Sequence, residues 1–146
     1  MRKGFSLLTA IIIILLIATL STLALSLSAF STKQSSDLYL REQAELLLQS
    51  ANEYALLALS AHEINATNGC INFINASFPD NTTPMFDINM SIHYIGMNLP
   101  SSCQRFSSND ISTIDSNITV IIDTIVQDHN VSTEPIRLHR RTIQKP

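Results

Sequence analysis

The residues that could do chemistry in this chain are two cysteines, four histidines and many hydroxyl side chains. The histidines lie far apart in the sequence, at His62, His93, His129 and His139. None of them has metal-ligand spacing to another histidine or to a cysteine. The serines and threonines lie in no nucleophile-elbow context, and glycines are too few for a phosphate-binding loop. We therefore expect no enzymatic activity, no cofactor and no metal site.

The two cysteines, Cys70 and Cys103, both follow a long apolar segment near the N-terminus. If that segment directs the rest of the chain out of the cytoplasm, the oxidising compartment favours a disulfide between them. The bond would close a loop of about 33 residues, which in the chain-entropy model stabilises a small domain by roughly 3–4 kcal/mol.

Asparagine supplies a second candidate chemistry, because Asn-x-Ser/Thr triplets are acceptors for N-linked glycans. Six triplets occur, at Asn65, Asn75, Asn81, Asn89, Asn117 and Asn130. Four of them also have an acidic residue two places before the asparagine, as in the acceptor motif of bacterial oligosaccharyltransferases. These four candidate glycosylation sites are Asn65, Asn89, Asn117 and Asn130. The alternative is that polar strand faces simply bring Asp and Asn together.

The apolar segment, Phe5 to Leu27, contains no charged residue, and Arg2 and Lys3 stand just before it. A helix needs about 20 apolar residues to span a bilayer, so the segment is long enough. The preceding positive charges orient it with the N-terminus in the cytoplasm. We expect a single-pass protein of the inner membrane whose C-terminal domain is periplasmic. A cleaved signal peptide ending near Ser28, followed by secretion of a disulfide-bonded binding domain, and a plain anchor that never assembles are the alternatives.

The sequence KGFSLLTA at positions 3–10 resembles the leader-cleavage site of type IV prepilins and pseudopilins. The resemblance implies that residues 1–4 are a leader, that a prepilin peptidase cuts after Gly4, and that the new N-terminal Phe5 is methylated. It implies an assembly helix at 5–29, which packs against other pilin-like subunits in a type IV pilus, type II secretion or DNA-uptake fibre.

Two positions depart from the pattern of that family. Thr9 stands where the family usually has a Glu, and Ser26 stands where many major pilins have a Pro. The family's Glu is thought to neutralise the N-terminal amine of a neighbouring subunit, and Thr9 has no carboxylate to offer. A buried charge without a partner is costly, so the resemblance implies a minor subunit at or near the fibre tip rather than the repeating body. The alternative is that Thr9 has no positional meaning.

Residues 30–63 continue the helix in amphipathic form, because apolar side chains recur at steps of three and four. The predicted apolar stripe is Leu40, Ala44, Leu47, Ala51, Tyr54, Ala58 and Ala61. The predicted polar side is Arg41, Glu42, Glu45, Gln49, Asn52 and Glu53. Such a stripe needs an apolar surface to bury against.

That surface is predicted in residues 64–146, the periplasmic domain. Strands are expected at 70–78, 85–94, 117–127 and 131–139, with Pro135 marking the last as an edge strand. The second strand alternates most clearly. Its predicted apolar face is Phe86, Ile88, Met90, Ile92 and Tyr94. The sequence therefore predicts an α+β fold, in which a long N-terminal helix, membrane-spanning and then amphipathic, packs on a small antiparallel β-sheet of about four strands.

The net charge of −3 gives no general case for binding nucleic acid. Basic residues gather at the C-terminus, where Arg137, Arg140, Arg141 and Lys145 are four of the nine Lys and Arg residues. This cluster could contact DNA during uptake, but it lacks interleaved aromatic residues for stacking on bases. Charges that guard an edge strand are the more common explanation, and contact with DNA is the alternative.

Overall fold

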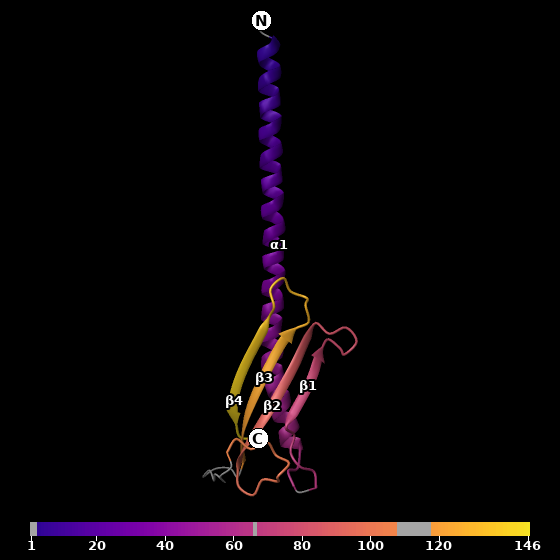
Figure 1. The fold of residues 1–146 in the computed structure, drawn as a ribbon, viewed down its shortest axis with the longest axis vertical. Coiled ribbons are helices and arrows are strands. Elements are labelled where there is room, and N and C mark those ends of the chain that lie inside the picture. The colour runs from indigo at the N-terminus through magenta and orange to yellow at the C-terminus, as the bar shows by residue number, and fades with distance from the viewer. Residues whose placement is uncertain (1–2, 66, 108–117) are drawn as a thin grey trace. The chain divides into compact units, whose positions relative to one another are not determined.

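The computed structural model describes residues 3–65, 67–107 and 118–146, with side chains from Leu7 onward. It contains one long helix followed by four strands, which is the α+β fold that the sequence predicts (Figure 1). The elements are α1 (Lys3–Ala61), β1 (Phe73–Phe78), β2 (Phe86–Gly96), β3 (Ile118–Asp128) and β4 (Arg137–Gln144). The Ser/Thr-rich stretch 31–36, the weakest part of the helix by sequence, is also helical.

The chain divides into two compact units, one ending at Tyr39 and the other running from Leu40 to Pro146. In the first unit every large apolar side chain from Leu7 to Phe30 is exposed. Five of its hydroxyl side chains donate to carbonyls one turn earlier in the helix, namely those of Thr19, Ser21, Thr22, Ser26 and Thr32. Thr19 bonds to Leu16 at 2.9 Å in this way. This part of α1 is apolar and long enough to cross a membrane.

The second unit contains a four-stranded sheet of order β1-β2-β3-β4, in which every neighbouring pair is antiparallel. β2 and β3 pair along their full length, from Phe86 with Asp128 to Gly96 with Ile118. The two edge strands, β1 and β4, are shorter. One face of the sheet lies against the outer part of α1 and is called here the helix face, and the opposite face is called the outer face (Figure 1).

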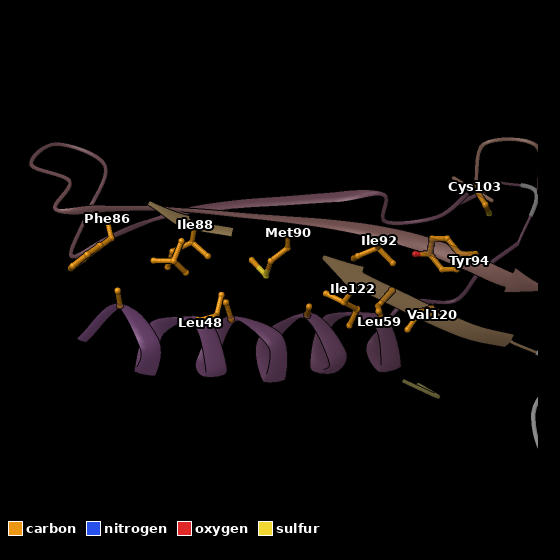
Figure 2. Close-up of a cluster of buried hydrophobic side chains, with 14 of the residues drawn as sticks. Leu48, Leu59, Phe86, Ile88, Met90, Ile92, Tyr94, Cys103, Val120 and Ile122 are labelled. Atoms are coloured by element: carbon orange, nitrogen blue, oxygen red, sulfur yellow. The ribbon is translucent and has the colours of Figure 1, made fainter. Parts of the chain in front are cut away.

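The hydrophobic core lies between the helix face and α1. All five side chains of the apolar face predicted for β2 are buried, and Phe86 and Ile92 are fully so. Figure 2 shows Leu48 and Leu59 of α1 directed toward the strands that carry Met90 and Ile122. Alternation in β2 and the neighbouring helix therefore create one continuous core.

The buried side of α1 differs in part from the predicted stripe. Leu40, Ala44 and Ala51 are buried as expected, but Tyr54 is 57% exposed and Leu47 is only half-buried. The positions that face the sheet instead are Leu48, Ala55 and Leu59, together with the predicted polar residue Asn52. Apolar residues occur on both sides of this helix, so periodicity alone could not decide which side the sheet covers.

Three strand boundaries also need correction. β1 begins at Phe73 rather than at residue 70, and β2 extends two residues past Tyr94. The fourth strand was wrongly placed at 131–139, since β4 starts at Arg137. β4 is an edge strand as predicted, but Pro135 precedes it and does not interrupt it.

The disulfide predicted between Cys70 and Cys103 is present, with their Cα atoms 5.0 Å apart. It attaches the loop after β2 to the segment before β1, and three hydrogen bonds reinforce this attachment. Asn72 makes two of them, donating to the Ser102 carbonyl at 2.8 Å and accepting from the Gln104 amide at 2.9 Å. The buried Tyr94 hydroxyl donates to the Ile71 carbonyl at 2.6 Å. Asn72 also accepts a backbone hydrogen bond from the Ile92 amide of β2 at 2.8 Å, so the segment before β1 stays attached to the sheet.

Candidate functional site

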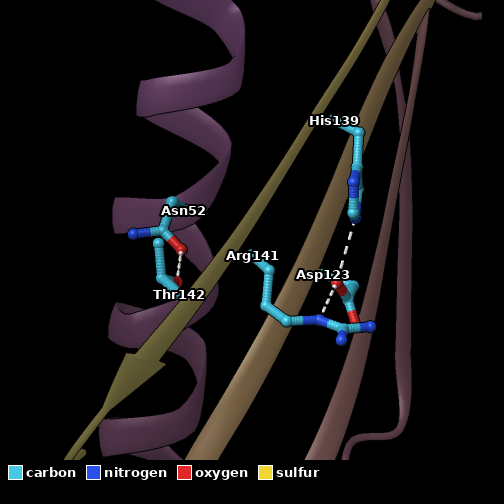
Figure 3. Close-up of polar contacts among 5 residues, drawn as sticks. All are labelled: Asn52, Asp123, His139, Arg141 and Thr142. Carbon is cyan, nitrogen blue, oxygen red and sulfur yellow. Dashed lines mark hydrogen bonds and ion pairs between the residues drawn. The ribbon is translucent and has the colours of Figure 1, made fainter.

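The most concentrated polar cluster in the described chain lies on the outer face where β3 meets β4. It consists of Asp123, His139 and Arg141 (Figure 3). The Asp123 carboxylate accepts hydrogen bonds from Arg141 Nε at 2.7 Å and Arg141 Nη2 at 2.9 Å. The ring of His139 is also in contact, with Nε2 at 3.0 Å from Asp123 Oδ1. Asp123 is nearly buried, whereas its two partners are more than half exposed.

This arrangement keeps Asp123 charged. The hydrogen bonds from Arg141 lower the pKa of the Asp123 carboxyl, burial opposes them, and the contact with His139 adds to the lowering. The same pairing raises the pKa of Arg141. The physical effect of the cluster is to fasten the side chains of an edge strand to the strand beside it.

On the helix face, β4 is fastened to α1 by a second polar contact. Thr142 Oγ1 donates to Asn52 Oδ1 at 2.7 Å, and Asn52 is buried (Figure 3). The sequence analysis placed Asn52 on the polar side because it falls outside the predicted apolar stripe. Its partner lies 90 residues later in the chain. Side chains on both faces of β4 are therefore drawn inward from the edge.

The turn between β3 and β4 depends on Asp128. Its carboxylate accepts from Ser132 Oγ at 2.8 Å and from the Ile136 amide at 2.9 Å. Burial would raise the pKa of Asp128, but these hydrogen bonds outweigh it and the pKa is lowered. Asp128 and Ser132 are also the acidic and hydroxyl residues of the acceptor motif around Asn130. Both therefore have a structural reason to be present.

The four candidate glycosylation sites occupy different environments. Asn130 is exposed in a turn with a positive φ of 57°. Asn89 is exposed on the outer face but pairs with both neighbouring strands. Asn65 accepts hydrogen bonds from the amides of Thr67 and Asn68. Asn117 lies outside the described residues. Modification of these sites remains a prediction, and an intact mass equal to that of the bare processed chain would refute it.

The C-terminal basic residues do not form a single patch. Arg137 and Arg141 belong to the outer face, whereas Arg140 pairs with Thr124 on the opposite side of the strand. Arg141 is committed to Asp123. This division weakens the case for a DNA-binding surface, which would need cations directed toward one backbone.

The remaining candidate positions are on α1. Gly4 and Phe5 lie in its first turn, where the structure describes the backbone alone, and Thr9 lies in its exposed apolar part. Cleavage, methylation and assembly at these positions are expectations that the structure does not test. Within residues 3–65, 67–107 and 118–146, no group of three or more His, Cys, Asp or Glu side chains could hold a metal ion.

A shallow cavity of about 610 Å³ lies beside Ile64, Met97 and Ile118. Ile118 directly follows residues 108–117, which lie outside the described chain, so we assign no ligand to this cavity.

No protein-family model, curated protein or solved structure matches this chain significantly. Function must therefore be argued from the helix, the sheet and the N-terminal motif.

Proposed function

We propose that this chain is a minor pilin-like or pseudopilin structural subunit of a type IV pilus, type II secretion or DNA-uptake fibre. It enters the inner membrane through α1, loses residues 1–4 to a prepilin peptidase, and assembles with other pilin-like subunits through the same helix. Its role is mechanical, and the chain needs no catalytic residue or cofactor for it.

The observation that carries this proposal is the continuity of α1 from Lys3 to Ala61. A signal peptide needs only an apolar segment followed by a cleavage site. Here the apolar segment continues as one helix into a second part, whose buried side includes Ala44, Leu48 and Leu59 in the core of the sheet. A helix that is apolar at one end and packed on a small sheet at the other fits a subunit that is first membrane-bound and then assembled.

Thr9 supports a position at or near the fibre tip. In an assembled fibre, apolar helices pack closely, and an N-terminal amine buried among them needs an acidic neighbour. A subunit with Thr9 cannot provide that carboxylate to a subunit beyond it. We therefore expect Thr9→Glu to make insertion into the fibre body more frequent, with the conservative variant Thr9→Ser behaving like the parent.

Fibre fractionation tests the proposal. The parent chain should appear in the sheared fibre fraction of cells that contain a prepilin peptidase and its assembly machinery, and should be absent from that fraction when the peptidase is deleted. Gly4→Val should block processing and keep the chain in the inner membrane. Ser6→Ala is the matched control, because it alters the same motif after the cleavage point.

Three outcomes separate the alternatives. A processed chain in the fibre fraction supports the proposal. A soluble periplasmic chain that begins near Ser28 supports a secreted binding domain. A full-length membrane chain that never reaches the fibre fraction supports an anchored protein that does not assemble.

A further inference from the structure

The β1 edge of the sheet lacks the usual protection of an edge strand. Natural sheets protect their edges with charged side chains, prolines or covering elements, because an open edge invites pairing with another strand. β1, with the sequence FINASF, contains neither a charge nor a proline. Phe73 is 64% exposed, and Asn75 and Ala76 are also exposed. No described element lies beyond β1 in the sheet (Figure 1).

β4 carries more charge than β1, and Arg137 and Arg140 are exposed, but two of its basic side chains contact the neighbouring strand. Arg141 and His139 reach back to Asp123 on β3, and Thr142 reaches back to Asn52 on α1 (Figure 3). These contacts direct two of the side chains toward β3 and the third toward α1. No described strand pairs with the backbone of β4 on the side away from β3, so this edge of the sheet is open to another strand.

We propose that β4 of one copy of this chain pairs with β1 of a second copy, head to tail, while the copies are in the membrane, so that the sheet extends across several copies before any of them enters a fibre. The inference rests on the proposed function, because copies that enter one membrane in the same direction have their sheets on the same side of it. Neighbouring strands of the sheet alternate in direction, so β1 and β4 run in opposite directions. Two copies in the same orientation therefore bring β4 and β1 together as an antiparallel pair.

Side chains at the two edges fix the register. Phe73 and Ile143 are large, apolar, and 64% and 66% exposed. Both belong to the outer face. Phe73 pairs with Ser91, Ser91 with Asp123 and Asp123 with Arg141, so these four residues share a face of the sheet. Ile143 lies two residues after Arg141 in the same strand and therefore lies on that face as well. Phe73 begins β1 and Ile143 is near the end of β4, so antiparallel pairing places them opposite each other. Burying these two side chains against each other favours the pairing.

The same register accounts for the other positions. It places the small Ala76 opposite Arg140, which leaves room for the long side chain. It sets Phe78 opposite Leu138 on the helix face, where both already contact the core. The side chains opposite each other are therefore compatible along the proposed pair.

The register also keeps adjacent copies at nearly the same level. Within one copy, Phe73 lies on the same rung of the sheet as Arg141. Pairing Phe73 of the next copy with Ile143 displaces that copy by two residues, about 7 Å along the strand direction. Because the contact is head to tail, it forms a row and does not close as a dimer.

Cysteine cross-linking of the full chain in membranes tests the register. The double variant Phe73→Cys, Ile143→Cys should give a ladder of dimers, trimers and larger species on oxidation. Phe73→Cys with Arg137→Cys is the matched control, because Arg137 is on the same face but about 20 Å from Ile143 along the strand. The control should stay monomeric. Ser77→Cys with His139→Cys, a second pair in the proposed register, should give a ladder if substitution at Phe73 impairs folding.

Single variants test the direction of pairing. Phe73→Cys and Ile143→Cys expressed in separate copies within one cell should give dimers that contain one of each and nothing larger. Dimers of Phe73→Cys alone would indicate a two-fold β1–β1 contact and overturn the proposal. So would a ladder in the control, or no ladder from either in-register pair. Sequencing the N-terminus of the same samples separates the edge-pairing hypothesis from the assignment as a pilin-like subunit. Phe5 at the N-terminus without a ladder rejects edge pairing alone. A ladder from a chain that retains Met1 rejects only the pilin assignment.

Discussion

The guanidinium of Arg141 binds the carboxylate of Asp123 through two atoms, Nε at 2.7 Å and Nη2 at 2.9 Å. The acid is on a central strand and the base is on the edge strand beside it. The bidentate geometry fixes both position and orientation. The pair therefore joins β4 to β3, and it directs the guanidinium of Arg141 toward β3 and away from the open edge.

Removing this contact should loosen the edge strand. We expect Arg141→Gln to lower the urea midpoint of the second unit measurably, because Asp123 stays nearly buried and loses its main donor. Arg137→Gln is the matched control, since Arg137 is an exposed arginine on the same face of the same strand. Near-ultraviolet circular dichroism of the full chain in detergent provides the signal. Equal midpoints for both variants would show that the pair contributes nothing to stability.

Stability should fall in acid. The folded-state pKa values of Asp123 and Asp128 are both lowered, so both carboxylates favour the folded state at pH values above about 4, the ordinary aspartate pKa. As pH falls through that value toward the lowered pKa values, the unfolded chain binds protons first and this stabilisation is lost. Urea midpoints measured from pH 7 to pH 3 check the prediction. The decrease should be smaller in Arg141→Gln, and a midpoint independent of pH in the parent would contradict it.

Two leucines two residues apart on α1 test the packing of helix against sheet. Leu48 is 4% exposed, whereas Leu46 is 66% exposed. Leu48→Ala should reduce the free energy of unfolding by about 2–5 kcal/mol, because it leaves a cavity against the strands. Leu46→Ala should change it by less than about 0.5 kcal/mol. Similar losses for both would mean that the described side of α1 does not face the sheet.

The disulfide should contribute strongly to a unit of this size. The double variant Cys70→Ser, Cys103→Ser should lose about 2–4 kcal/mol of unfolding free energy, because the unfolded chain regains the freedom of the closed loop. Adding a thiol reductant should destabilise the parent by a similar amount and leave the double variant unchanged. A parent chain whose midpoint is insensitive to reductant would refute a structural role for the bond.

Much of the architecture was predictable because its signals are local. Alternation over 86–94 identified the buried face of β2 correctly, and the charge-free segment 5–27 identified the apolar end of α1. The position of both cysteines beyond that segment was enough to predict their pairing. Each of these inferences needs only a periodicity or a compartment, and no knowledge of distant contacts.

The errors arise where distant residues decide. Asn52 can be buried because its Oδ1 accepts a hydrogen bond from Thr142 Oγ1 on β4, and helix periodicity contains no information about that strand. β4 itself was placed too early because its charged sequence RLHRRTIQ looks like a soluble tail. Two of its basic side chains, Arg141 and His139, contact the carboxylate of Asp123 on β3. This contact can be predicted only when the register between β3 and β4 is known.

The most direct test of the account is the N-terminal residue of the mature chain purified from membranes or fibres. Peptide mass spectrometry should find Phe5 at the N-terminus, carrying one added methyl group, and Gly4→Val should abolish this peptide. An N-terminus near Ser28, or a chain that retains Met1 in cells with an active prepilin peptidase, would contradict the assignment as a pilin-like subunit.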